Sequence, residues 1–243
     1  MTDRVIPKAY KPTPINLFAR VMTAGQNLPG RMGYMCHRKL KRRLRARMHY
    51  PFYDVLADTG PGDLCLDLGA NRGEFTRKLA ETGAEVISFE PDSVAYAALE
   101  ANCGTMENVT LHKKAVSTKD TQMMLRRTAN WDDETALAHT VSSSIVHDNA
   151  GMSAELGEMV DVIDLPKFMT ELDRDFRIIK MDIEGAEWDI LQVLLDHPVL
   201  QRSDTLFVET HERWDPERCI PLFDEMLDRA VAMDRPYINL YWV

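Results

Sequence analysis

The chain has 243 residues, of which 45% are hydrophobic, so it is long enough to bury one sizeable core and is most simply a single-domain enzyme with an N-terminal extension. Its net charge of −9 is uneven: residues 1–49 hold 12 Lys/Arg and 1 Asp/Glu, whereas residues 50–243 hold 17 and 37. The acidic main body argues against general nucleic-acid binding. Four scattered cysteines without a Cys-x-x-Cys pair argue against disulfides and a zinc site. No stretch approaches the length of a membrane span, so we expect a soluble, cytoplasmic protein.

Residues 1–50 are interpreted as an N-terminal arm and a basic helix, and residues 51–243 as the main domain. The segment "HRKLKRRLRARM" (37–48) carries most of the basic charge. Its apolar residues recur every four positions, at Leu40, Leu44 and Met48. This spacing predicts a helix that packs one narrow face on the domain and leaves its charges in solvent. Contact of residues 37–48 with an anionic membrane surface or polymer is the alternative.

From Phe52 onward, apolar strand-like runs alternate with segments of helical periodicity. The predicted strands are 63–68, 85–90, 108–116, 177–183 and 205–210. One helix is expected at 73–82, and another begins where Asp92 or Ser93 can cap it. Apolar strands separated by helices imply right-handed crossovers. The predicted fold is therefore α/β, with a Rossmann-like, doubly wound and mainly parallel sheet covered on both faces.

Residues 119–161 interrupt this alternation. The stretches "QMMLRRT" and "EMVDVIDL" have strand character, and a polar loop lies between them with Ser142, Ser143 and Ser144. Ligands bind beyond the carboxyl ends of the strands in such folds, so we interpret 119–161 as a substrate-recognition insertion over that edge. Ser143 and Ser144, together with Ser142, are then candidates to hydrogen-bond the substrate.

The turn after the first strand reads "GANRG" (69–73), and Asp67 precedes it. A dinucleotide fingerprint has another glycine inside this turn and places a pyrophosphate on the following helix, where a carboxylate is unfavourable. A ligand with a sulfonium, an amino group and a ribose but no phosphate suits the acidic turn better, and S-adenosylmethionine is such a ligand. Glu90 ends the next strand, where its two oxygens can accept hydrogen bonds from ribose hydroxyls.

Five segments follow one another in residues 62–243. They are "LDLGANRGEFT" (66–76), "FEPD" (89–92), "VTLHKKAVS" (109–117), "SSS" (142–144) and "IIKMDIEGAEWDIL" (178–191). In this order they resemble class I methyltransferases and, more narrowly, the FkbM family. The resemblance implies an S-adenosylmethionine-dependent O-methyltransferase domain over 51–243, acting on a hydroxyl or carboxyl of a sugar, glycan or secondary metabolite. The cofactor contacts that it implies are Asp67, Gly69, Asn71, Gly73 and Glu90, with Ala115 and Val116 beside the adenine ring.

Carboxylates and one histidine follow the last two predicted strands. Asp182 ends the fourth strand, with Glu184 and Glu187 after it, and the fifth strand ends in "ETHE" with Glu209 and His211. We take Asp182 first and Glu184 second as organisers of methyl transfer. His211 is a candidate base near neutral pH. Glu187 and Glu209 are candidate substrate contacts.

The leading prediction contains no metal site. In the alternative, Asp182, Glu209 and His211 hold one divalent cation, as in catechol-type methyltransferases that use magnesium. The acceptor decides between these alternatives, because a neutral hydroxyl needs a base or a metal to remove its proton whereas a carboxylate needs neither.

Two rival functions remain open. A nicotinamide-dependent oxidoreductase is disfavoured by the missing glycine, and a non-enzymatic scaffold with a degenerate methyltransferase fold is disfavoured by the intact acidic residues between 67 and 187. Methylation of nucleic-acid bases is weaker still, because "MDIEGAEW" lacks the Asn/Asp-Pro-Pro-aromatic motif. We expect a small-molecule or glycan acceptor. A helix is also expected around 223–231, and only the strand-like "YINLYWV" (237–243) comes after it, so a shortened terminal strand pair is expected.

Overall fold

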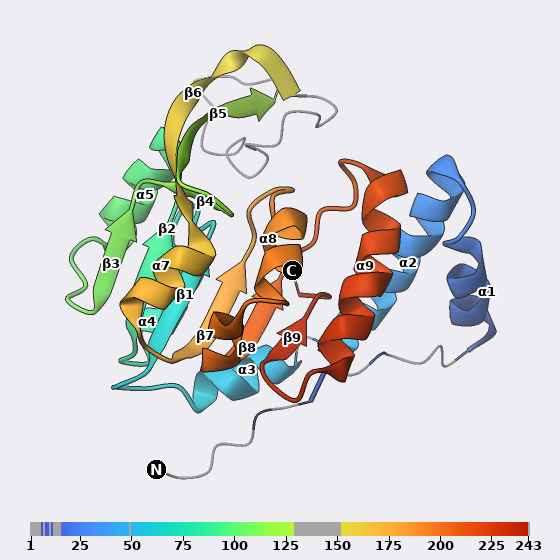
Figure 1. The fold of residues 1–243 in the computed structure, drawn as a ribbon, viewed down its shortest axis with the longest axis horizontal. Coiled ribbons are helices and arrows are strands. Elements are labelled where there is room, and N and C mark those ends of the chain that lie inside the picture. Colours follow the sequence, from blue (N-terminus) through green and yellow to red (C-terminus); the bar gives the residue numbers. More distant parts are fainter. Residues whose placement is uncertain are drawn as a thin grey trace.

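A computed structural model describes residues 6, 8, 9, 11, 16–48, 50–128 and 152–242 (Figure 1). Within these residues, six parallel strands form a sheet in the order β3-β2-β1-β7-β8-β9. Their bounds are β1 Leu64–Leu68, β2 Glu85–Phe89, β3 Val109–His112, β7 Phe176–Met181, β8 Ser203–Val208 and β9 Tyr237–Asn239. The strand order reverses between β1 and β7, and such a switch point is where open α/β sheets bind ligands.

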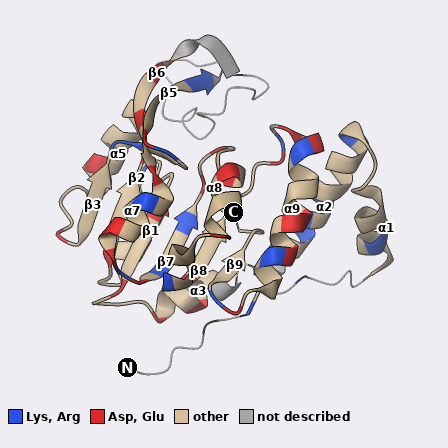
Figure 2. Cartoon of the chain, in the orientation of Figure 1, with Lys and Arg blue, Asp and Glu red and all other residues tan. Residues whose placement is uncertain are grey.

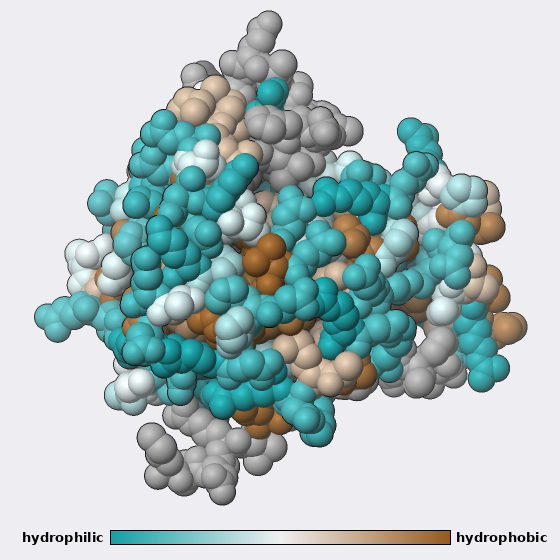
Figure 3. Space-filling model, viewed as in Figure 1, coloured by the Kyte–Doolittle hydropathy of each residue, from teal (hydrophilic) through white to brown (hydrophobic). Residues whose placement is uncertain are grey.

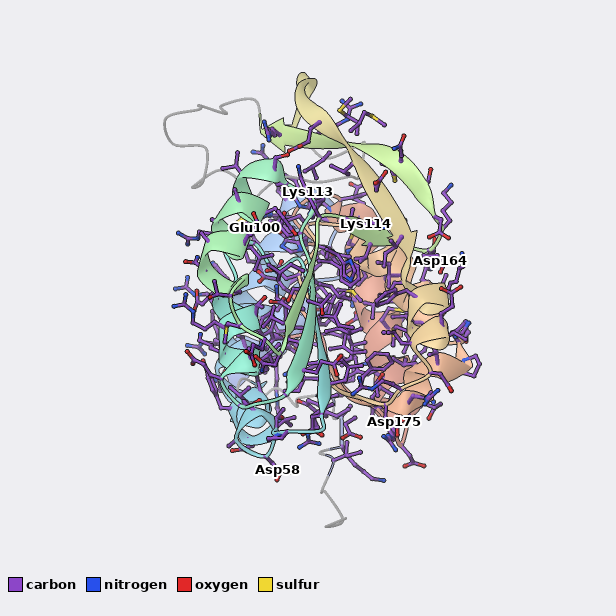
Figure 4. All side chains as sticks on the ribbon, turned by 90° about the vertical axis from the view of Figure 1, so that its left-hand side faces the viewer. Asp58, Glu100, Lys113, Lys114, Asp164 and Asp175 are labelled. Carbon is purple, nitrogen blue, oxygen red and sulfur yellow. The ribbon has the colours of Figure 1, made fainter. Side chains whose placement is uncertain are left out.

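Helices cover both faces of this sheet, as the view toward its β3 edge shows (Figure 4). On one side lie α3 Tyr50–Ala57, α4 Glu74–Ala80 and α5 Ser93–Cys103; on the other lie α7 Leu165–Leu172, α8 Glu187–Leu194, the short 3-10 helix η2 Pro198–Arg202 and α9 Pro216–Ala232. Successive strand residues face opposite sides. Cys65 therefore packs with the first helix layer and Leu66 with the second. The predicted doubly wound α/β fold is confirmed.

A smaller sheet extends beyond the main one. It consists of β4 Ala115–Ser117, β6 Met152–Asp164 and β5 Thr121–Thr128, in that order, and β5 and β6 pair as antiparallel strands. Figure 1 shows this ribbon beyond the end of the main sheet toward which β2 and β7 point. Glu158 of β6 ties it to the start of α5 by accepting a hydrogen bond from the backbone N–H of Ser93 at 2.9 Å. Within the ribbon, Arg127 of β5 donates to the same carboxylate, also at 2.9 Å. Both strands predicted within 119–161 are thus present; the serine run at 142–144 lies outside the described residues.

Two helices precede the sheet, α1 Leu17–Gly25 and α2 Gly30–Met48. The basic segment 37–48 is the second half of α2, which runs beside α9 (Figure 1). Leu40 and Leu44 are 8% and 5% exposed and belong to the main hydrophobic core, so the predicted apolar face is confirmed for these two residues. The side chain of Met48 lies outside the described part of the chain.

A buried ion network fastens α2 to the loop after β8. The Lys41 ammonium donates hydrogen bonds to the carbonyl oxygen of Thr210 and to Glu212 Oε1, both at 2.9 Å. His37 Nε2 lies 3.3 Å from the same carboxylate. Burial alone would raise the pKa of Glu212, but the charges of Lys41 and His37 outweigh it and lower that pKa to about 2. The Glu212 carboxylate in the loop after β8 therefore depends on Lys41 and His37 of α2 for its compensating positive charge.

The surface of α1 is partly apolar. Leu17, Phe18 and Val21 are 78%, 42% and 53% exposed, and brown atoms lie over α1 at the right of Figure 3. No helix within the described ranges is long and apolar enough to cross a membrane. Membrane contact by residues 37–48 stays a prediction.

Replacing Lys41 with Ala should lower the free energy of unfolding by about 3 kcal/mol, because it strands the buried Glu212 carboxylate while leaving His37 beside it. The folded pKa of Glu212 lies below its unfolded value, so the pair's contribution is complete at neutral pH and is lost as the pH falls toward 2. Urea unfolding of Lys41→Ala beside Lys39→Ala measures this, since Lys39 is exposed on the same helix. Equal stability of the two variants would contradict the network's role.

Candidate functional site

The register of the sheet aligns the ends of four strands. The last residue of β1, Leu68, pairs with Phe89 of β2 and Met181 of β7, and Met181 pairs with Val208 of β8. The residues that follow these strands therefore form one row at the carboxyl edge, in the order Glu90, Gly69, Asp182 and Glu209. Figure 2 shows acidic residues in red at the loops before α8 and α9, where this row ends.

The turn after β1 requires glycine at both ends. Gly69 has φ +79°, and a Cβ there would lie 1.7 Å from the carbonyl oxygen of Asp182. Gly73 has φ +84° and begins α4; a Cβ there would lie 2.7 Å from Leu99 Cδ1. Both glycines are therefore needed for close packing of the protein itself, and not only for clearance around a ligand. Asn71, with φ 48°, completes the left-handed turn.

Glu90 lies beside this turn and is 6% exposed. Its carboxylate accepts hydrogen bonds from the backbone N–H groups of Asn71 at 2.8 Å and Asp92 at 2.9 Å. Burial raises the pKa of Glu90 to about 7, although these two hydrogen bonds oppose the shift. Each oxygen keeps a lone pair for another donor, so the group can hold a diol.

Asp67 lies beneath the turn and is fully buried. Its carboxylate is 3.1 Å from the Lys180 ammonium and accepts a hydrogen bond from Thr76 Oγ1 at 2.6 Å. Lys180 also donates to the carbonyl oxygen of Gly69 at 2.5 Å. Burial disfavours the charge on Lys180, but Asp67 and Asp182 outweigh it and raise its pKa. Asp67 thus contacts the groups that shape the turn, and sequence reasoning missed Lys180.

Ala115 and Val116 both lie in β4 and are buried, at 5% and 3% exposure. Ala115 packs in the small core under the β5–β6 ribbon, whereas Val116 belongs to the main core. Contact of either residue with an adenine ring stays a prediction.

Four carboxylates surround His211 at the other half of the row. The backbone N–H of His211 donates to Glu187 Oε1 at 2.7 Å, and its ring Nδ1 is 3.1 Å from the same oxygen. Ring Nε2 lies 3.5 Å from Glu184 Oε1, 3.7 Å from Asp182 Oδ1 and 3.9 Å from Glu209 Oε1. All five residues predicted to act after the last two strands therefore meet at one place.

This crowding shifts several pKa values. Burial would lower the pKa of His211, but the charge of Glu187 and hydrogen bonds to Glu184 and Glu187 hold it well above the usual value. Burial and the neighbouring charge of Asp182 raise the pKa of Glu209 to about 7. Burial also raises the pKa of Asp182, against the attraction of Lys180 and His211. The shift favours the protonated ring, which has no lone pair with which to act as a base.

The loop that carries Asp182 and Glu184 is conformationally strained. Glu184 has φ 55°, an uncommon value for a residue with a side chain, and Arg213 holds its carboxylate at 2.7 Å. Asp182, Glu184 and His211 each offer one ligand atom, and these atoms lie within 4.8 Å of one another. These three residues could hold a divalent cation. The set differs from the metal site considered in the sequence analysis, in which Glu209 stood in place of Glu184.

A cavity of about 480 Å³ adjoins this cluster, between α2 and the loop after β8. Glu209 and His211 line one side, and Arg38 and Arg42 of α2 line the other. No sequence pattern indicated that these arginines lie near the site, because about 170 residues separate them from His211.

Comparisons with known proteins identify the family of the chain. The model of the "Methyltransferase FkbM domain" matches residues 67–232, more than half of the chain. No curated protein matches. Among solved structures, the chain is similar to the 23S rRNA methyltransferase ErmE, with 16% identity, a TM-score of 0.35 and coverage of 73% of this chain and 49% of that one. The chain thus spans about half of that protein, and at this similarity we infer nothing about the acceptor from it. The matched residues include the turn, the row of strand ends and the cluster around His211, and the chain belongs to the FkbM methyltransferase family.

Proposed function

We propose that the protein is an S-adenosylmethionine-dependent O-methyltransferase acting on a hydroxyl group of a sugar, glycan or secondary metabolite. The observation that carries this proposal is the row of strand ends, in which Glu90 and Gly69 are followed by Asp182 and Glu209. Neighbouring strands lie about 4.8 Å apart, so a cofactor on the first pair brings its reactive end within reach of the second.

The cofactor half comprises the turn at 69–73 and Glu90. When bound, S-adenosylmethionine supplies an electrophilic methyl group on a sulfonium. Glu90 holds the ribose through its two oxygens, which the N–H groups of Asn71 and Asp92 fix in position. Asp67 acts indirectly, by pairing with the Lys180 ammonium that holds the carbonyl of Gly69.

The acceptor half uses Glu209 as base. Its side chain is 26% exposed and lines the cavity, and its pKa of about 7 suits proton transfer near neutral pH. Glu209 would take the proton of the acceptor hydroxyl, while the cofactor, when bound, would supply the methyl group that the acceptor oxygen receives. Protonated His211 keeps the remaining carboxylates in place, and Asp182 aligns the acceptor. Because a base is available, a hydroxyl acceptor is favoured over a carboxyl.

Changing Glu90 to Ala should weaken binding of S-adenosylhomocysteine by about 1–3 kcal/mol, or about 5- to 150-fold in Kd, through the loss of charged hydrogen bonds to the ribose. Wild-type affinity should also fall as the pH drops below about 7, because the ionised carboxylate accepts both bonds and the protonated form does not. Calorimetric titration measures both effects, with Glu100→Ala as an exposed control on α5. An unchanged Kd for Glu90→Ala would remove its ribose role, and binding of NADH instead would overturn the cofactor.

Changing Glu209 to Gln should lower methyl transfer to a hydroxyl acceptor by about 100-fold or more, because the amide accepts no proton. The wild-type rate should rise with pH and level off above about 7, as Glu209 ionises, and the variant should lose this rise. Transfer from a labelled methyl donor measures the rate, with Glu225→Gln of α9 as an exposed control.

The same assay distinguishes a base from a metal. If Glu209 acts alone, wild-type turnover survives treatment with EDTA. Loss of turnover that magnesium restores, together with a small effect of Glu209→Gln, would instead assign the proton's removal to a cation held by Asp182, Glu184 and His211.

A further inference from the structure

The cavity of about 480 Å³ beside His211 has walls of opposite charge. Its volume falls within the range of small-molecule sites, which is about 300–1,000 Å³. The wall formed by the loop after β8 carries the candidate base Glu209. The wall formed by α2 carries Arg38 and Arg42, which lie one helical turn apart on the same face. The base and the two guanidinium groups therefore face the same cavity.

The cations of α2 differ in what they contact. Lys41 is 12% exposed and its ammonium is occupied by Thr210 and Glu212, so it holds the helix in place. Arg38 and Arg42 are exposed, and within the described residues neither has a hydrogen bond or an ion pair. Arg213, on the opposite wall, is already bonded to Glu184. Among the described residues, the guanidinium groups of Arg38 and Arg42 on the cavity wall thus have no partner.

The sequence leaves these groups without local partners. Residues 4–53 contain no Asp or Glu, so α2 carries no acid of its own to pair with Arg38 or Arg42. Like charges four residues apart on a helix repel, and a bound dianion would relieve that repulsion. The main domain is strongly acidic and by itself would repel an anionic acceptor, so a cationic wall has a function beside this site.

We propose that the acceptor is a phosphate-bearing hydroxyl compound whose phosphate binds Arg38 and Arg42 while its hydroxyl reaches Glu209. This inference rests on the proposed function and specifies its substrate class. Guanidinium groups bind phosphate oxygens through paired N–H donors, and two such groups match a phosphomonoester or diphosphate. Helix α2 then supplies half of the acceptor site. This role explains why Lys41 anchors α2 to the loop that carries His211.

The test compares two double variants of the full chain. Arg38→Ala/Arg42→Ala removes these two cations from the cavity wall. Arg31→Ala/Lys39→Ala removes the same charge from exposed positions of α2 that do not line the cavity. Pyrophosphate is titrated calorimetrically into each protein in the presence of S-adenosylhomocysteine. We expect the wild type and the Arg31/Lys39 variant to bind pyrophosphate equally, and the Arg38/Arg42 variant to bind it at least tenfold more weakly. Affinity for S-adenosylhomocysteine should be the same in all three.

Equal pyrophosphate binding by the two double variants, or absence of binding by the wild type, would overturn the inference. The inference would also be overturned if the protein bound phosphatidylglycerol vesicles through Arg38 and Arg42 but did not bind pyrophosphate. In that case α2 would bind a membrane and not the acceptor. Failure of the wild type to bind S-adenosylhomocysteine would count against the proposed function itself. A second assay compares methyl transfer to glucose 6-phosphate and to glucose, and to glycerol 3-phosphate and to glycerol. The inference is supported if the wild type prefers the phosphorylated acceptor of each pair and only the Arg38/Arg42 variant loses this preference. It is contradicted if the wild type shows no preference.

Discussion

The buried ammonium of Lys180 connects the two halves of the site. It lies 3.1 Å from Asp67 and 2.5 Å from the Gly69 carbonyl oxygen, and 3.8 Å from Asp182. Asp67 lies near the end of β1, Gly69 follows that strand, and Asp182 follows β7. One cation therefore contacts both strands at the switch point of the sheet. Without that charge, Asp67 would be an unpaired buried carboxylate. The shape of the turn and the position of Asp182 therefore depend on the same interaction.

Acidic groups accumulate on the other side of this cation. Glu184, Glu187 and Glu209 join Asp182 around His211. Glu187 and Glu184 raise the pKa of the imidazole, whereas burial and the charge of Asp182 raise the pKa of Glu209. Ion pairs thus raise the pKa of His211, and burial raises the pKa of Glu209, although the two side chains lie within 4 Å of one another. The result is a carboxylate that can gain or lose a proton near pH 7, beside a fixed positive charge.

Much of the main sheet could be predicted from the sequence. Apolar runs such as "DLCLDL" have the composition of buried parallel strands, and "GANRG" specifies a turn that only glycine allows at Gly69. The gathering of the residues after β7 and β8 could also be predicted, because the carboxyl ends of parallel strands lie at the same edge of the sheet. Their roles were not fixed by pattern, since the charge state of His211 depends on its distances to four carboxylates. The contact between Lys41 and Glu212 could not be predicted from local sequence either, because it forms only when distant parts of the chain pack together.

The most direct test of this account is a crystal structure of the chain with S-adenosylhomocysteine bound. The account predicts that the ribose hydroxyls donate to Glu90, that the sulfur faces the cavity beside Asp182 and Glu209, and that the turn at 69–73 encloses the homocysteine portion. A ligand bound away from Glu90, or a sulfur pointing away from Glu209, would contradict the division of the row into a cofactor half and an acceptor half.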